Sequence, residues 1–285
     1  MPQQDDSNST SGIQLYTAGT PNGHKINILV EELGVDYTVH KIDIAKNVQK
    51  EDWFLKINPN GRIPAIVDKN EGRNKRVFEG GAIMLYLCER YDKEHKISFP
   101  YDSDDYWEMV EWIIWMQSGI GPMQVSRHTL STTQHQLELT TNKPKQQGQA
   151  NHFYRYAPTK ISYAIERYQT ETKRLYRVLE DRLVSRAPDS DGNQWLVGGK
   201  YTIADLASFS WVNWAEWAGV DTKPFPKVEK WVQAIASRPA TQKGVNIPEK
   251  FEMKEAMKTK AGEEEYAKHH SNWVMRGMEE ESGKH

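Results

Sequence analysis

The segment Asn58-Pro59-Asn60-Gly61-Arg62-Ile63-Pro64-Ala65-Ile66-Val67 places a tight turn directly before a short apolar run. Asparagine, proline and glycine in this combination are turn formers, because they tolerate or impose the backbone angles that a turn requires. The run at 63–67 is too short for a typical helix and has the length of a buried strand. We therefore predict a strand at 63–67 behind a turn at 58–61.

Strand and helix patterns alternate on both sides of this turn. Residues 13–17 predict a strand that ends in the turn 19–23, and Gly34 predicts the end of the helix that follows. Further strands are expected at 37–42 and near 77–78, and a helix from about 82. The order βαβαββα over 13–92 is the plan of a thioredoxin-like α/β domain, with helices on both faces of a small mixed sheet. Ligands of such a sheet are expected beyond the carboxyl ends of its strands.

The chain shows only helical patterns after a linker at 93–103. Ser103 precedes two aspartates and predicts a helix N-terminus, followed by an apolar face at Trp107, Val110 and Ile114 and a break at 119–122.

Three more helices are expected beyond residue 158. One carries an apolar stripe from Ile161 to Leu183, and one opens at the capping-box pattern Thr202-Ile203-Ala204-Asp205 and runs to Trp217. The last spans 227–237 and is stopped by Pro239. These patterns predict an all-α second domain at 104–243.

Three segments do not fit this two-domain body. Residues 1–12 are polar and predict a disordered leader, whereas 244–285 form a charged tail for which docking and disorder both stay open. Residues 125–147 show no helical stripe, and such a loop is uncommon within a compact domain. Because their codons permit splice-donor and acceptor patterns, we hypothesise a retained intron, with a genuine surface insertion as an equal alternative.

Composition excludes several classes of protein. The 285 residues carry 37 Lys and Arg against 39 Asp and Glu, a net charge of −2, which argues against a nucleic-acid binder and a polybasic membrane-surface protein. A single cysteine excludes an internal disulfide framework and a Cys-based metal cage. No apolar run approaches the ~18–20 residues of a membrane helix. We expect a cytoplasmic protein that binds neither nucleic acid nor membrane, and we predict no metal site.

Several separated motifs, in one order, resemble those of the cytosolic glutathione transferases across about 13–243. They are Asn60-Gly61-Arg62-Ile63-Pro64-Ala65, Phe78-Glu79-Gly80-Gly81-Ala82-Ile83, Leu196-Val197-Gly198, Tyr201-Thr202-Ile203-Ala204-Asp205-Leu206, Phe225-Pro226 and Ser237-Arg238-Pro239-Ala240. Two more, Thr20-Pro21-Asn22-Gly23-His24-Lys25 and Tyr163-Ala164-Ile165-Glu166-Arg167-Tyr168, are similar to one branch. That branch holds the fungal nitrogen-catabolite regulator and the bacterial glutathione-dependent disulfide-bond reductases.

The resemblance implies glutathione as cosubstrate, with Asn22 and Thr20 as the catalytic pair. A thiol titrates near ~8.5, so it needs help to ionise at neutral pH. Asn22 lies between a strand end and a helix start, where amide donors and the helix dipole favour a thiolate. The alternative is an ordinary turn residue or helix cap.

The resemblance also implies glutathione-binding residues. Arg62, Ile63 and Pro64 correspond to the cis-proline step, where Ile63 pairs with the cysteinyl part through its backbone, and a trans turn proline is the alternative. Glu79 and Gly80 correspond to the helix start that holds the γ-glutamyl end. The family usually has serine where this chain has Gly80, so a hydroxyl donor is lost and weaker binding is expected.

Three residues call for separate interpretations. Arg167 matches an arginine that contacts glutathione in bacterial members, although a solvated surface arginine is the alternative. Tyr16 falls inside the first strand, which favours core packing over a catalytic tyrosine. Cys88 lies on an apolar helix, which favours a buried small hydrophobe and argues against the cysteine-dependent classes.

The first hypothesis for function is an enzyme, a glutathione transferase whose branch favours disulfide or peroxide reduction. A small electrophile, disulfide or peroxide is the expected second substrate, and a homodimer is implied by the resemblance. The alternative is a non-catalytic glutathione-binding regulatory protein. That regulator carries a long Asn/Gln-rich leader, whereas 12 residues precede the first strand here, so the sequence favours the enzyme.

Overall fold

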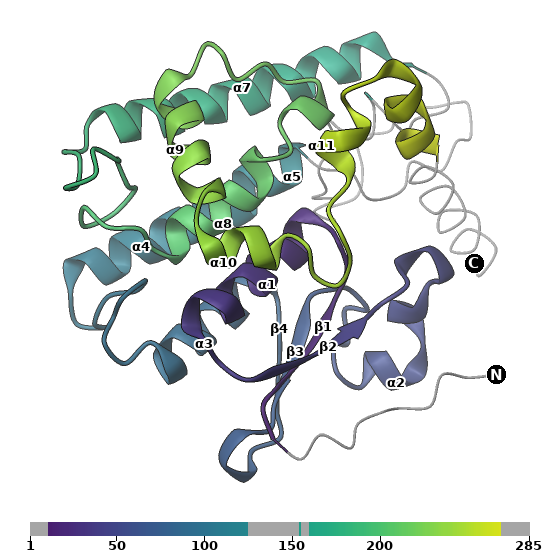
Figure 1. Ribbon diagram of the computed structural model, residues 1–285, viewed down its shortest axis with the longest axis vertical. Coiled ribbons are helices and arrows are strands. Elements are labelled where there is room, and N and C mark those ends of the chain that lie inside the picture. The colour runs from purple at the N-terminus through teal and green to yellow at the C-terminus, as the bar shows by residue number, and fades with distance from the viewer. Residues whose placement is uncertain (1–10, 125–153, 155–159, 269–285) are drawn as a thin grey trace, which may run out of the picture.

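The computed structural model describes residues 11–124, 154 and 160–268. Its first part is a four-stranded mixed sheet of order β2-β1-β3-β4 (Figure 1). The central strand β1 (Ile13–Thr17) pairs in parallel with β2 (Tyr37–Lys41) and antiparallel with β3 (Ala65–Asp68), which pairs antiparallel with β4 (Lys75–Phe78). The predicted thioredoxin-like domain is confirmed.

Alternating side chains of the strands serve two apolar layers. Ile13, Leu15 and Ile66 join the main core, together with α1 (Pro21–Leu33) and α3 (Gly80–Tyr91). Tyr16, Ala65 and Val67 instead pack with Phe54 of the short helix α2 (Asp52–Leu55). Each face of the sheet is therefore covered, as a period of two along the strands requires. Three short helical turns complete this part: η1 (Ile44–Lys46), η2 (Val48–Lys50) and η3 (Asn70–Gly72).

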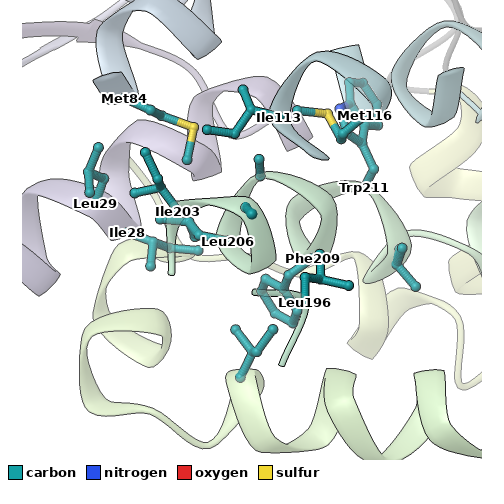
Figure 2. Close-up of a cluster of buried hydrophobic side chains, with 14 of the residues drawn as sticks. Ile28, Leu29, Met84, Ile113, Met116, Leu196, Ile203, Leu206, Phe209 and Trp211 are labelled. Atoms are coloured by element: carbon teal, nitrogen blue, oxygen red, sulfur yellow. The ribbon is translucent and has the colours of Figure 1, made fainter. Parts of the chain in front are cut away.

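The second part consists of helices, and it packs on α1. Its elements are α4 (Asp104–Trp115), the π-helical turn η4 (Met116–Ile120), α5 (Gly121–Gln124), α7 (Ser162–Val184), α8 (Ile203–Val212), η6 (Glu216–Ala218), α9 (Pro226–Ala236), α10 (Pro239–Gly244) and α11 (Met253–Ala256). Figure 2 shows how side chains from α1, α3, α4 and α8 meet in one buried cluster. The predicted all-helical domain is confirmed, and its core is continuous with that of the sheet.

The predicted apolar face of α4 is wrong. Trp107 and Ile114 are 50% and 56% exposed, whereas Met109 and Ile113 are fully buried. This helix has apolar residues on two sides, so periodicity alone does not say which side faces the core.

The predicted break at 119–122 is also wrong, because the chain continues through η4 into α5. The glycines there permit close packing. A Cβ on Gly119 would lie 3.3 Å from Leu175 Cδ2, and one on Gly121 would lie 3.2 Å from Trp211 Nε1.

The chain beyond α9 differs from the prediction of a last helix ended by Pro239. Proline fits the first turn of a helix, and Pro239 begins α10. Met253 of α11 is buried with Trp214 and Trp217, and Tyr266 packs edge-on against Trp217. Up to residue 268, therefore, the charged C-terminal segment docks on the helical domain.

Two of the expected segments lie mostly or wholly outside the described residues. These are the leader, of which 11 and 12 are described, and 125–147, for which the intron hypothesis stays untested. Gly12 already belongs to the folded body, because its amide donates to Asn70 Oδ1 at 3.2 Å.

The predicted capping box at the start of α8 is present. Asp205 is fully buried, and its carboxylate accepts hydrogen bonds from the amides of Leu196 and Thr202, from Thr202 Oγ1 and from Trp231 Nε1, at 2.9–3.2 Å. Burial raises the pKa of Asp205 to about 6, and the four donors oppose that rise. One carboxylate thus ties together α8, α9 and the turn before α8.

Replacing Asp205 by alanine should reduce the free energy of unfolding by roughly 2–4 kcal/mol, because it removes the N3 half of the capping box and leaves buried donors without an acceptor. Urea denaturation followed by tryptophan fluorescence measures the change. Asp221→Ala is the matched control, since Asp221 is exposed and caps only the amide of Lys223. Equal losses in the two variants would contradict the structural role of Asp205.

Candidate functional site

The candidate site begins where β1 gives way to α1. Thr20 is the N-cap of this helix, and its Oγ1 accepts a hydrogen bond from the amide of Gly23 at 3.2 Å. The connection leaves no room for a side chain at Gly23, where a Cβ would lie 2.1 Å from the carbonyl oxygen of Ala18. Thr20 and Asn22 are therefore held, half-buried, at a helix N-terminus, where the macrodipole favours an anion.

The side chain of Asn22 has a defined partner. Its Oδ1 accepts a hydrogen bond from Lys25 Nζ at 3.0 Å, one turn further along α1. With the oxygen engaged in this way, the amide nitrogen of Asn22 keeps its two N–H donors for another acceptor.

The turn before β3 forms the second edge of the site. The peptide bond between Ile63 and Pro64 is cis. The loop is held by Asn58, whose Nδ2 donates to the carbonyl of Arg62 at 2.6 Å and whose Oδ1 accepts from the amide of Asn60 at 2.9 Å. The predicted strand start at 63 is wrong by two residues, since pairing begins at Ala65 and proline has no N–H to donate.

Glu79 and Gly80 form the third edge, at the start of α3. Asn60 Nδ2 donates to Glu79 Oε1 at 3.2 Å, which joins this edge to the loop before Pro64. Glu79 has a φ of 69°, a left-handed value that is costly for a residue with a side chain and is found mostly where function requires it. A Cβ on Gly80 would lie 3.8 Å from Lys25 Cδ, so α1 and α3 begin side by side.

The structure therefore brings together the motifs at 20–25, 58–64 and 79–80. Arg62 is half-buried in the second of them. Arg167 is exposed on α7, where its charge acts on Glu171, and no contact between Arg167 and the other predicted site residues is found in the described part of the chain. Its role stays a prediction.

The two residues expected to belong to the core are buried. Tyr16 is 6% exposed and stacks on His40, with ring centroids 4.5 Å apart. Cys88 is a buried free cysteine, and burial raises the pKa of its thiol well above the usual value. Neither resembles a reactive group, since a reactive cysteine has a lowered pKa and access to solvent.

Sequence reasoning missed Lys25 and Gln117. Lys25 is fully buried, and its Nζ donates to Asn22 Oδ1 and, at 2.9 Å, to Oε1 of Gln117 on η4. The available signal was a lysine three and four residues before Ile28 and Leu29, on the apolar side of a helix. Nothing in the sequence indicates that Gln117, 92 residues away, is its partner.

The comparison with known families decides what kind of protein carries this arrangement. The N-terminal domain of glutathione S-transferases matches residues 11–89, and their C-terminal domain matches residues 150–239. The chain belongs to the glutathione transferase family. Within it, the chain lies in the branch of Ure2 and the bacterial disulfide-bond oxidoreductases, as the motifs indicated.

Individual relatives cover most of this transferase-family chain. The disulfide-bond oxidoreductase YfcG of Escherichia coli is 39% identical over 232 residues, which are 80% of this chain and 92% of the relative. A glutathione transferase homolog from Lodderomyces elongisporus, solved with two GSH per subunit, is 41% identical at a TM-score of 0.70 and is matched over 83% of this chain and 98% of its own. The nitrogen regulation fragment of the yeast prion protein Ure2p is 32% identical at a TM-score of 0.69, over 83% and 96%.

Neither a membrane-spanning helix nor a metal-binding cluster occurs among the described residues. No described helix combines the length and the apolar character that a membrane span needs. Within the same ranges, no three His, Cys, Asp or Glu side chains gather so that they could hold a metal ion.

Replacing Gly80 by serine should tighten glutathione binding in this transferase-family chain. The Cβ has room, and one hydrogen bond to a carboxylate is worth roughly 1.5–3 kcal/mol, or a roughly 10- to 150-fold lower Kd in calorimetry. Gly80→Ala is the control, because it adds the Cβ without the hydroxyl. Equal affinities for the serine and alanine variants would refute a role for the missing hydroxyl.

Proposed function

We propose that this protein is a glutathione-dependent disulfide-bond reductase. The observation that carries the proposal is the convergence of three edges on one place: the Thr20–Asn22 turn, the cis Ile63-Pro64 loop and the Glu79-Gly80 helix start, joined by the contacts of Asn60 and Lys25. Glutathione has an anionic γ-glutamyl end, a cysteinyl amide and a thiol. The start of α3, the backbone of Ile63 and the start of α1 offer complementary groups to these three parts.

In the proposed reaction the site stabilises the glutathione thiolate. The N–H donors of Asn22 and the hydroxyl of Thr20 face the sulfur, and the positive end of α1 favours its ionised form. The thiolate attacks one sulfur of the substrate disulfide, so that a mixed disulfide with glutathione forms and the other sulfur leaves as a thiolate, which takes up a proton. A second glutathione thiolate then attacks the mixed disulfide and releases the reduced substrate and oxidised glutathione.

The comparisons support this proposal over peroxide reduction and transfer to an electrophilic carbon. The Escherichia coli relative is named a disulfide-bond oxidoreductase, which favours disulfide over peroxide as the substrate. The Lodderomyces elongisporus structure holds two GSH per subunit, the number that either reduction consumes, whereas transfer to an electrophilic carbon consumes one. Cys88 is buried, so the reaction uses no accessible protein thiol among the described residues. A reaction that consumes reduced glutathione fits the cytoplasm, and we propose that location.

The similarity to the Ure2p fragment favours a second candidate, a glutathione-binding regulator without turnover. Steady-state assays with glutathione plus hydroxyethyl disulfide, cumene hydroperoxide and a chloronitrobenzene separate the candidates. Glutathione binding without turnover of any of the three would favour the regulator. Faster turnover of hydroxyethyl disulfide than of the other two substrates would support the reductase.

Asn22→Ala should lower kcat for hydroxyethyl disulfide roughly 10- to 100-fold at neutral pH, because the thiolate loses its amide donors. The loss should shrink at alkaline pH, where glutathione ionises without help. Asn74→Ala is the matched control, since Asn74 is exposed at the end of β4 away from Glu79. A pH-independent loss would show that Asn22 does not act on the thiol.

We further propose a homodimer, as the resemblance implies, with the outer side of α4 in the interface. This side exposes Trp107 and Ile114 by 50% and 56%, and Tyr101, which precedes the helix and packs on Trp107, is 63% exposed. Such a cluster of large apolar side chains is unusual on a surface. Trp107→Glu should produce monomers in sedimentation-velocity ultracentrifugation. Val184→Glu, at an exposed apolar position of α7, should leave the dimer intact. A monomeric wild type, or a dimeric Trp107→Glu variant, would contradict this interface.

A further inference from the structure

Lys25 is a buried cation directly beneath the proposed thiol site. Its side chain has no exposed surface, and its Nζ lies 3.0 Å from Asn22 Oδ1, 2.9 Å from Gln117 Oε1 and 3.3 Å from Met116 Sδ. An ammonium group has three donors, and these three acceptors account for all of them. The group is therefore fixed in position rather than free to reach solvent.

Burying such a charge is costly, and the groups around Lys25 offset only part of that cost. The charge lies 5.3 Å from the centroid of the Trp211 ring, a cation–π arrangement. Figure 2 shows Met116 and Trp211 beside one another at the edge of the buried cluster. Among the described residues, the carboxylate whose charge acts on Lys25 is that of Glu79, which is exposed. An apolar residue of similar length would fill this place at a lower cost in stability.

The contact with Asn22 explains what the charge provides. A side-chain amide can present either its oxygen or its nitrogen to a neighbour. Lys25 is a donor only, so it selects the oxygen, and the N–H donors of Asn22 then point away from Lys25.

We propose that Lys25 is a positioning residue of the glutathione site: its ammonium orients the Asn22 amide with the N–H groups toward the bound sulfur, and its charge favours thiolate over thiol. This inference rests on the proposed function, because it assumes that glutathione sulfur lies at Asn22. It adds a contribution of the helical domain, since Gln117 of η4 holds Lys25 in place.

The same cation should give the reaction a characteristic pH dependence. Burial lowers the pKa of Lys25 to about 7, and the charge of Glu79 before α3 opposes that shift. On α1 itself, His24 stays neutral because burial lowers its pKa to about 4. The neighbours from η4 and α8 (Met116, Gln117 and Trp211) carry no charge. Rising pH therefore ionises the thiol but removes the proton from Lys25, so activity should pass through a maximum near neutrality.

Lys25→Met tests the proposal, because methionine is apolar and of similar length. The readout is the ultraviolet absorbance of the bound glutathione thiolate as a function of pH. The pKa of the bound thiol should rise by roughly 1–2 units, the effect of one charge at about 6–8 Å with an effective dielectric constant near 20. Binding of S-methylglutathione, which has no ionisable thiol, should change little. Lys41→Met, at an exposed lysine paired with Glu249, should leave the thiol unaffected.

Stability gives a second readout, in which Lys25→Met should improve on the wild type instead of impairing it. The pKa of Lys25 is lower in the folded protein than in the unfolded chain, so the unfolded state binds more protons between about 7 and 10.5 and the wild type loses stability as pH falls through that range. Lys25→Met removes this penalty. Its gain in melting temperature over the wild type should therefore be larger below neutral pH than at alkaline pH.

Failure of the proposed function and failure of the role of Lys25 give different outcomes. If the wild type does not lower the pKa of bound glutathione, the proposed function fails. If the wild type does so and Lys25→Met does so equally, the role of Lys25 is overturned while the function stands. Lys25→Gln is a second test that can be used if the methionine variant misfolds, because glutamine keeps a donor for Asn22 without the charge. An unchanged thiol pKa in the glutamine variant overturns the electrostatic part of the proposal.

Discussion

The burial of α1 on all sides is the constraint on which the rest of the structure depends. Every residue from Gly23 to Val30 is buried, which is the property of a helix enclosed by its neighbours rather than resting on a surface. One side packs on the sheet and α3, and the other on α8 and α10 (Figure 1). On α10, Gly244 comes so close that a Cβ would lie 2.6 Å from Ile28 Cα. The N-terminus of α1 is therefore fixed relative to both domains before any ligand arrives, which is the condition for a preorganised anion site.

Because this helix is enclosed, three of its polar side chains are buried as well, and each has different surroundings. Asn27 donates from Nδ2 to the carbonyl of Ile247 at 2.6 Å. His24 remains neutral and packs edge-on against Phe251, with ring centroids 5.1 Å apart. Lys25, whose pKa burial lowers to about 7, is the one of the three that carries a partial charge near neutral pH. The segment after α10 therefore covers Asn27 and His24, and it supplies one hydrogen-bond acceptor, the carbonyl of Ile247.

Local signals made part of this structure predictable. Thr202 and Asp205 indicate the start of a helix by a pattern of only four residues. Gly34 ends α1 with a φ of 61°, a value that few other residues adopt. The three motifs of the site are local in the same sense, and their meeting follows from the thioredoxin-like order of elements.

Features that depend on distant partners were not predictable. The core side of α4 is determined by its contacts with α8 and α3 and not by the helix itself, because Ile113 and Ile114 are equally apolar. Pro239 by itself indicates the end of a helix, and the charged composition of the segment up to 268 does not distinguish docking from disorder. The docking depends on Trp214 and Trp217, against which Met253 packs. The position of Lys25 beside Gln117 likewise requires the contact between two domains.

Affinity and activation are separable in this site. Gly80 lies where the family usually has serine, and the 3.8 Å from its missing Cβ to Lys25 shows that packing does not exclude the hydroxyl. Its loss is therefore expected to act on the γ-glutamyl carboxylate, while the contacts of Asn22 with Lys25 are kept. The contact from Gln117 through Lys25 to Asn22 is proposed to act instead on ionisation of the thiol. Under the proposed function, such a chain is expected to hold glutathione less tightly than relatives with serine but still to activate its thiol, which suits a reaction in which the bound molecule must leave as a disulfide and be replaced in every turnover.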